Sequence, residues 1–276
     1  MYKLRSLLLG LSFLAGIGIA APPAMAGTVI ATLNAFGSGD TITLHAVRPN
    51  GTPFGVQVLN GMSTFTRTGG TEASQLVGSG GNSFFAFCVE PYEDAQLNAS
   101  YAYTMSPLTS AANSSILGGI GADRADDIAV LFGQFAPNLA APMTPVQTSA
   151  LQVALWEIVS ELSSNPFNVN SGNTYFTTPA SSSFTNVMDL AQNYLTYVGS
   201  ANGSAPRAQG LQALTINGNQ DFLAQVASTA PEPGTWLMML IGFGLVGSAM
   251  RSDRRRTVRV DASPRLPRNG QSPFAA

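Results

Sequence analysis

The sequence predicts a single β-rich α+β domain with two or three helices, flanked by an N-terminal signal peptide and a C-terminal transmembrane helix. Between these two segments lies the body of the chain, residues 27–227. Runs of alternating polar and apolar residues, typical of strands, occupy its first part. Amphipathic runs at helical spacing follow, and two more strand-like runs close the body. The order of strands, helices and strands favours α+β over the alternating order of a parallel βαβ fold.

The N-terminus has the features of a secretory signal. Lys3 and Arg5 precede an apolar run over residues 7–20, and Ala24-Met25-Ala26 supplies the small residues of a cleavage site. We predict a signal peptide over residues 1–26, read by the Sec export machinery. An uncleaved membrane helix is the alternative, and the shortness of the apolar run disfavours it.

The strand-like runs dominate the first half of the exported body, residues 27–227. Residues 40–46 alternate polar and apolar, and residues 54–58 repeat the alternation after a Pro-Asn-Gly sequence typical of hairpin loops. The glycine-rich stretch 78–82 reads as a loop. Further strands are predicted over residues 63–67, 84–89, 101–105, 211–216 and 221–226.

Helices are predicted in the second half of the body. Residues 123–135 place Ile128, Leu131 and Phe132 on one helical face. Thr144-Pro145-Val146-Gln147 combines an N-cap, a proline at the first helical position and a capping-box glutamine. We expect that helix to run through Leu162 and to stop before Asn165-Pro166. Residues 182–198 form a third candidate.

The C-terminal part combines a rigid turn, an apolar run and a basic cluster. Pro231-Glu232-Pro233 cannot lie inside a helix, and residues 235–250 carry no charge. As a helix this run covers about 24 Å, slightly less than a hydrocarbon core of about 30 Å. By the positive-inside rule, the arginines that follow stop transfer on the cytoplasmic side of the inner membrane. They are Arg251, Arg254, Arg255 and Arg256.

This arrangement, over residues 228–256, resembles the PEP-CTERM sorting signal of Gram-negative bacteria. The resemblance rests on Pro-Glu-Pro, Trp236-Leu237-Met238-Met239, the glycine-rich run 242–247 and the arginines, in the same order and spacing. It implies processing by an exosortase in a bacterium that makes extracellular polysaccharide. An ordinary C-terminal membrane anchor is the alternative. We expect residues 257–276 to form a disordered cytoplasmic tail.

Composition excludes several classes of function. The body carries twelve acidic residues and four arginines, so it lacks the basic surface that nucleic acid requires. Its single histidine, His45, and single cysteine, Cys88, leave no catalytic triad motif, no internal disulfide and no His/Cys zinc site. We therefore expect no cofactor, no metal and no enzyme activity. His45 reads as an exposed strand residue.

Two clusters of acidic residues could indicate calcium binding, and carboxylates could also serve a polysaccharide-active enzyme. One comprises Glu90, Glu93 and Asp94, and the other lies within residues 123–127. Neither has the spacing of a calcium loop or of a paired-carboxylate motif. We interpret the first as a solvated loop and the second as a helix N-terminus, where negative charge is favourable.

The lone cysteine lies in an apolar run that suits a buried strand, where it is expected to be a small core residue. On the capped helix, Gln152 and Trp156 are four residues apart and share one face. Phe87-Cys88-Val89-Glu90 and Leu151-Gln152-Val153-Ala154-Leu155-Trp156 together resemble the thioester domains of bacterial surface adhesins. The resemblance implies a thioester crosslink between Cys88 and Gln152, with Phe87 and Trp156 shielding it from water.

The sequence thus predicts an exported protein of the cell surface or extracellular matrix, whose precursor is anchored in the inner membrane. Its expected partners are the exosortase, the export machinery and an amine-bearing surface or matrix component that the thioester would capture. The alternative is a passive structural or scaffolding protein of the biofilm matrix, in which the cysteine is buried and inert.

Overall fold

A computed structural model describes residues 27–37, 41–47, 51–72, 74–111, 119–161, 164–177, 182–227, 239–245 and 251. The chain divides into two compact units, Met1–Ala227 and Ser228–Ala276. The first unit holds every named helix and strand.

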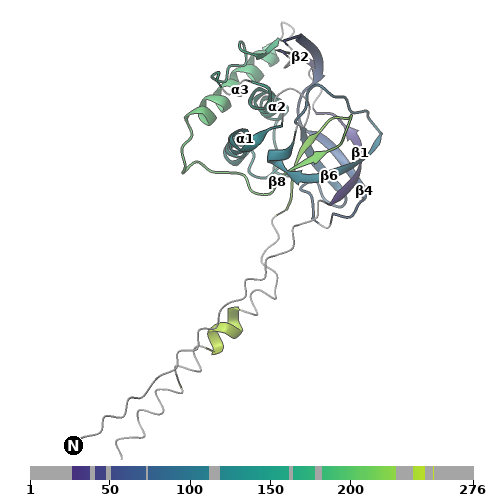
Figure 1. The fold of residues 1–276 in the computed structure, drawn as a ribbon, viewed down its shortest axis with the longest axis vertical. Helices are drawn as coiled ribbons and strands as arrows, with labels where there is room; N and C mark the ends of the chain where they lie inside the picture. Colours follow the sequence, from purple (N-terminus) through teal and green to yellow (C-terminus); the bar gives the residue numbers. More distant parts are fainter. Residues whose placement is uncertain are drawn as a thin grey trace, which may run out of the picture. The chain divides into compact units, whose positions relative to one another are not determined.

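A closed antiparallel barrel of six strands forms one half of the body (Figure 1). Aromatic side chains fill its interior: Phe65 stacks on Phe84, and both Tyr103 and Phe222 meet Phe65 edge-on. In order around the barrel, the strands are β1 (Thr28–Ala35), β4 (Ser63–Gly69), β5 (Ser83–Cys88), β9 (Phe222–Gln225), β8 (Leu211–Thr215) and β6 (Ser100–Pro107).

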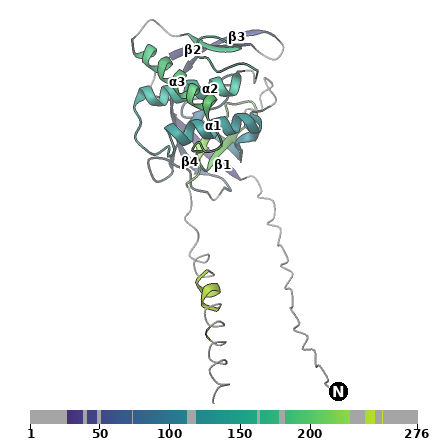
Figure 2. The ribbon, with the colours of Figure 1, turned by 90° about the vertical axis from the view of Figure 1, so that its left-hand side faces the viewer.

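A second, antiparallel sheet has the order β3-β2-β7 and lies at one end of the body (Figure 2). It comprises β2 (Thr41–Val47), β3 (Pro53–Leu59) and β7 (Thr174–Thr177). Ile42, Leu44 and Ala46 alternate along β2 and are buried. His45 points to the other face, where its ring stacks on Tyr175 at 4.6 Å. It is half-buried, so the expected exposed position is only partly correct.

Three α-helices form a layer against the barrel (Figures 1 and 2). They are α1 (Gly121–Phe135), α2 (Pro145–Ser160) and α3 (Ser182–Ser200), and a short 3-10 helix, η1 (Leu108–Ser110), precedes them. Every residue of α2 from Thr148 to Ser160 is buried, because α1 and α3 pack against it and the barrel lies beside it. The predicted capping box at Thr144 and Gln147 is confirmed.

The α+β class is confirmed, and so are the predicted hairpin, the later strands and three helices. Two strands were not predicted, β1 and β7, and β7 falls between α2 and α3, so the order of elements is less simple than expected. Helix α2 ends at Ser160 rather than running through Leu162, since the next residue, Glu161, has an extended backbone with φ −74° and ψ 151°.

Several sequence predictions fall outside the described residues. These are the signal peptide over 1–26, the tail over 257–276 and most of the predicted span over 235–250. Within that span residues 239–245 are described, and they are helical. A search of the described residues finds no helix with the length and apolarity needed to cross a membrane.

Candidate functional site

Cys88 is the last residue of β5 and lies where the strand loses one of its two neighbours. On one side it pairs with Phe222 of β9. On the other side the pairing with β4 begins at Ser63 opposite Ala86, so no β4 residue faces Cys88. The residue is only 6% exposed. A buried backbone amide and carbonyl in this position need hydrogen-bond partners from elsewhere.

Gln152 supplies these partners from the middle of α2. Its Oε1 accepts a hydrogen bond from the Cys88 backbone N–H at 3.0 Å, and its Nε2 donates to the Cys88 carbonyl at 2.7 Å. The primary amide therefore replaces the missing strand neighbour. It is fully buried and joins two positions that are 64 residues apart.

The sulfur of Cys88 has its own polar neighbours. Gln220 Nε2, in the turn between β8 and β9, lies 2.6 Å from Sγ and 3.2 Å from the carbonyl oxygen of Glu90. The thiol donates to the same carbonyl at 3.5 Å. Two glutamine side chains thus meet at Cys88: Gln152 contacts its backbone and Gln220 its sulfur. No local pattern points to Gln220, because it lies 132 residues from Cys88 in the chain.

Burial raises the pKa of the Cys88 thiol far above its ordinary value. The indole N–H of Trp156 opposes this shift, and so does a backbone hydrogen bond from Glu90, while the negative charges of Glu90 and Asp221 add to it. The indole nitrogen has no hydrogen-bond partner of regular geometry within the described residues. It is therefore available to stabilise negative charge that develops on the sulfur.

A cavity of about 190 Å³ gives access to this group. Cys88, Trp156 and Gln220 line it, and the acidic residues Glu93 and Asp94 stand among its other wall residues. Strand β3 contributes an apolar side of the cavity through Val56 and Val58. The sulfur is thus buried but borders a small cavity with carboxylates in its wall.

The structure brings Cys88, Gln152 and Trp156 together. Phe87, the neighbour of Cys88 on the strand, contacts Phe132 of α1 with its ring, at a centroid distance of 5.2 Å. This contact places Phe87 on the helix side of β5. The crosslink and the shielding roles of Phe87 and Trp156 stay predictions.

The interpretation of Glu90 as part of a solvated loop was wrong. Glu90 is 2% exposed, because the β8–β9 turn covers it through Gln220, while its neighbour Asp94 is exposed as expected. Asp123 lies in the first turn of α1, as predicted for the second acidic group. In the described part of the chain, no group of three or more His, Cys, Asp or Glu side chains is arranged to hold a metal ion.

Of the predicted sorting residues, Arg251 is described and is helical and exposed. The others lie outside the described residues, namely Pro231, Glu232, Pro233, Arg254, Arg255 and Arg256. Comparison with protein families matches residues 229–256 to the PEP-CTERM protein-sorting motif.

The chain carries a PEP-CTERM sorting signal. The match confirms the resemblance drawn from the Pro-Glu-Pro turn, the apolar run and the arginines. A PEP-CTERM signal implies export, processing by an exosortase and sorting at the membrane. No curated protein and no solved structure matches the chain significantly, so the likeness of the body to thioester adhesins stays a prediction.

Proposed function

We propose that this exosortase-sorted protein attaches covalently to an amine-bearing component of the cell surface or matrix, through a thioester between Cys88 and Gln152. The observation that carries the proposal is the position of the Gln152 amide, which two hydrogen bonds hold against Cys88 where both residues are buried. An acyl transfer between two side chains requires this kind of fixed proximity.

The bond forms in one exchange of groups. The Cys88 sulfur attacks the side-chain carbonyl carbon of Gln152, the C–N bond breaks, and the amide nitrogen leaves as ammonia with the thiol proton. The Cys88 backbone N–H, which already donates to Oε1, stabilises the negative charge that develops on that oxygen. The Trp156 indole and the Gln220 amide assist ionisation of the sulfur.

Capture of the target is a second acyl transfer, in which an amine is the attacking group and the Cys88 thiol is the leaving group. A primary amine attacks the thioester carbonyl, the C–S bond breaks, and Cys88 regains its proton while Gln152 keeps the new amide bond. Each molecule reacts once, so the protein is a binding module and no turnover is expected. The exported body contains no lysine, and it therefore offers no side-chain amine that would consume its own thioester.

A passive structural protein is the second candidate. One observation favours it: the Gln152 amide already satisfies the Cys88 backbone as a strand neighbour would, and this alone stabilises the contact between α2 and β5. In that case the thiol is inert, as the strong upward shift of its pKa would make it.

Intact-mass measurement of the processed protein separates the two candidates. A thioester lowers the mass by about 17 Da, and methylamine then adds about 31 Da while freeing the thiol. A Cys88→Ala variant is the control and should show the full mass of its sequence before and after methylamine. A wild-type protein with full mass and an alkylatable Cys88 after mild unfolding would contradict the thioester.

A further inference from the structure

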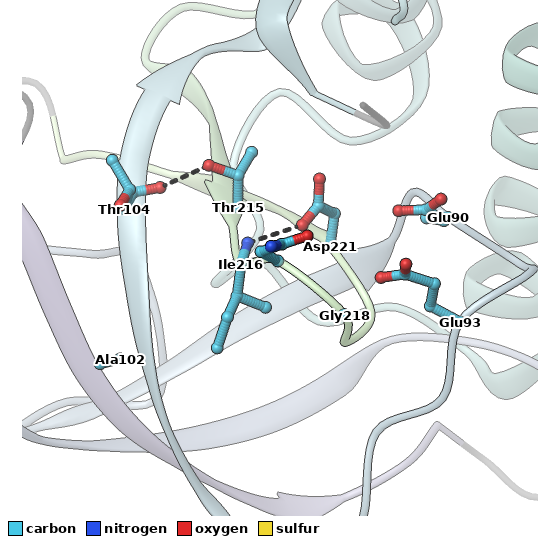
Figure 3. A pocket seen from close by; sticks show the side chains of 9 residues that line it. Glu90, Glu93, Ala102, Thr104, Thr215, Ile216, Gly218 and Asp221 are labelled. Carbon is cyan, nitrogen blue, oxygen red and sulfur yellow. Dashed lines mark hydrogen bonds between the residues drawn. The ribbon is translucent and has the colours of Figure 1, made fainter. Parts of the chain in front are cut away.

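A second and larger cavity, of about 300 Å³, lies next to the cysteine site on the outside of the barrel (Figure 3). Strand β6 contributes Thr104, strand β8 contributes Thr215, and the turn that follows β8 contributes Asp221. The loop after β5 supplies Glu90 and Glu93. Three carboxyl groups thus line one cavity, and no arginine or histidine is among its wall residues.

Among these three carboxyl groups, that of Glu90 is buried without a hydrogen-bond partner for one of its oxygens among the residues described. The residue is 98% buried, since only 2% of its surface is exposed, and its Oε1 has no hydrogen-bond partner within the described residues. In Figure 3 its carboxylate and that of Glu93 point from the β5–β6 loop towards the side that Asp221 occupies. A buried polar atom without a partner costs free energy, so a ligand that satisfies it has a ready site.

The other polar groups of the cavity are already engaged. Asp221 Oδ1 accepts the backbone N–H of Ile216 at 2.8 Å, and the hydroxyl of Thr215 donates to the Thr104 carbonyl at 3.2 Å. These contacts fix the β8–β9 turn and the far wall. They leave the carboxyl group of Glu90 as the unpartnered acceptor among the described residues of the cavity, with Glu93 half-buried beside it.

A cavity with this lining selects a cation that carries hydrogen-bond donors. The acidic groups do not converge on a point that would hold a metal ion, within the residues that the structure describes. The volume is also far larger than a bare divalent cation needs, and it matches the lower end of small-ligand pockets. An alkylammonium group suits this lining, because one of its N–H donors can satisfy the unpartnered Glu90 Oε1 while its chain occupies the remaining space.

We propose that this cavity binds a primary ammonium group of the target, such as a lysine side chain, and holds it beside Cys88. Glu93 lines both this cavity and the smaller one at Cys88, and the Glu90 carbonyl contacts the sulfur of Cys88. The role in capture rests on the proposed function. The binding of ammonium does not, since it needs no thioester.

The electrostatics of Glu90 agree with this assignment. Burial, followed by the charges of Glu93 and Asp221, raises the pKa of Glu90 to about 8. An ammonium group placed among these three carboxyls replaces repulsion between like charges with attraction, and it favours the ionised form of Glu90.

The test uses the full processed protein with Cys88→Ala, in which no thioester forms. Titration with n-butylammonium chloride, followed by NMR chemical shifts, should show saturable binding, with n-butanol as the neutral probe. Glu90→Gln, which keeps size and removes charge, should weaken the binding at least about tenfold. Asp189→Asn removes a charge from an exposed position of α3 and should leave the binding unchanged.

Several results would overturn the inference: no saturable binding, equal binding by the Glu90→Gln variant, or displacement of the probe by millimolar calcium at the same residues. If Glu90→Gln fails to fold, Glu93→Gln at the half-buried position replaces it, and unchanged binding there counts against the site. Ammonium binding without a thioester in the wild type would leave the cavity assigned and remove the capture function. A thioester without ammonium binding would support the capture function and remove the cavity assignment.

Discussion

The side-chain amide of Gln152 forms two hydrogen bonds with the backbone of Cys88, in the place where β5 has no strand neighbour. The Gln152→Ala variant leaves a buried N–H and a buried C=O unpaired. We expect the free energy of unfolding to fall by about 2–4 kcal/mol, measured by urea denaturation. Gln209→Ala, at an exposed position, is the control and should change it by less than about 0.5 kcal/mol. Equal effects would show that the pairing contributes little.

Trp156 lines the cavity at Cys88 and is 1% exposed. Trp156→Phe keeps an aromatic ring but removes volume and the indole N–H. If the thioester forms, we expect water to reach it faster, with a hydrolysis rate at least about tenfold higher. The rate is measured as a gain of about 18 Da with time, the mass of one water added on hydrolysis. Tyr197→Phe on α3 is the control, and equal rates in both variants would remove the shielding role of Trp156.

Loss of the capping box at the start of α2 should lower the free energy of unfolding only modestly. Thr144 accepts the Gln147 backbone N–H, and the Gln147 side chain accepts the Thr144 N–H at 2.8 Å. Thr144→Ala should lower the free energy of unfolding by about 1 kcal/mol. Thr196→Ala removes an exposed hydroxyl from within α3 and should have a smaller effect. A reversed order in thermal unfolding would contradict the role of the cap.

Glu161 joins the end of α2 to β7. Its carboxylate accepts the backbone N–H groups of Asn173 and Thr174 at 3.1 and 3.0 Å, and the side-chain amide of Asn165 at 2.7 Å. Glu161→Ala removes both carboxylate oxygens, and with them all three hydrogen bonds in a buried site, so we expect the free energy of unfolding to fall by about 3 kcal/mol. Amide hydrogen exchange at Thr174 should rise in the same variant. Unchanged protection there would show that β7 is held by β2 alone.

Two buried carboxyls make stability depend on pH. Burial raises the pKa of Glu90 and of Glu157 to about 8, from 4.5. The folded state then binds more protons than the unfolded state between these values, so the free energy of unfolding decreases as pH rises from about 4.5 to 8. Glu90→Gln should reduce that decrease by about 2–4 kcal/mol, measured by urea denaturation across this range. Parallel pH profiles for the variant and the wild type would contradict the assignment.

Much of the fold followed from local patterns. The alternation in residues 41–47 and 53–59 and the capping box before α2 each act within a few residues, so the sequence indicates them directly. Strand β1 also alternates, with Val29, Ala31 and Leu33 buried, but it directly follows the predicted cleavage site and was not recognised. Strand β7 has four residues, too few for a periodicity to be visible.

Only part of the candidate site could be predicted from the sequence. Gln152 and Trp156 were found because one helical turn separates them, and Cys88 because it is the single cysteine. Gln220 and the burial of Glu90 depend on the β8–β9 turn covering the end of β5, a contact across more than 100 residues that no local pattern encodes. Closure of the barrel, in which β1 lies between β4 and β6, is non-local in the same way.

The barrel also constrains when the body can acquire its structure. Within the described residues, the first strand, β1, and the last, β9, are both members of the same ring. A growing chain therefore cannot complete the ring until Gln225 has been synthesised, and Cys88 lacks its β9 neighbour until then. The environment proposed for the thioester would therefore be completed late, so the nascent polypeptide would carry an ordinary thiol and an ordinary amide throughout its elongation.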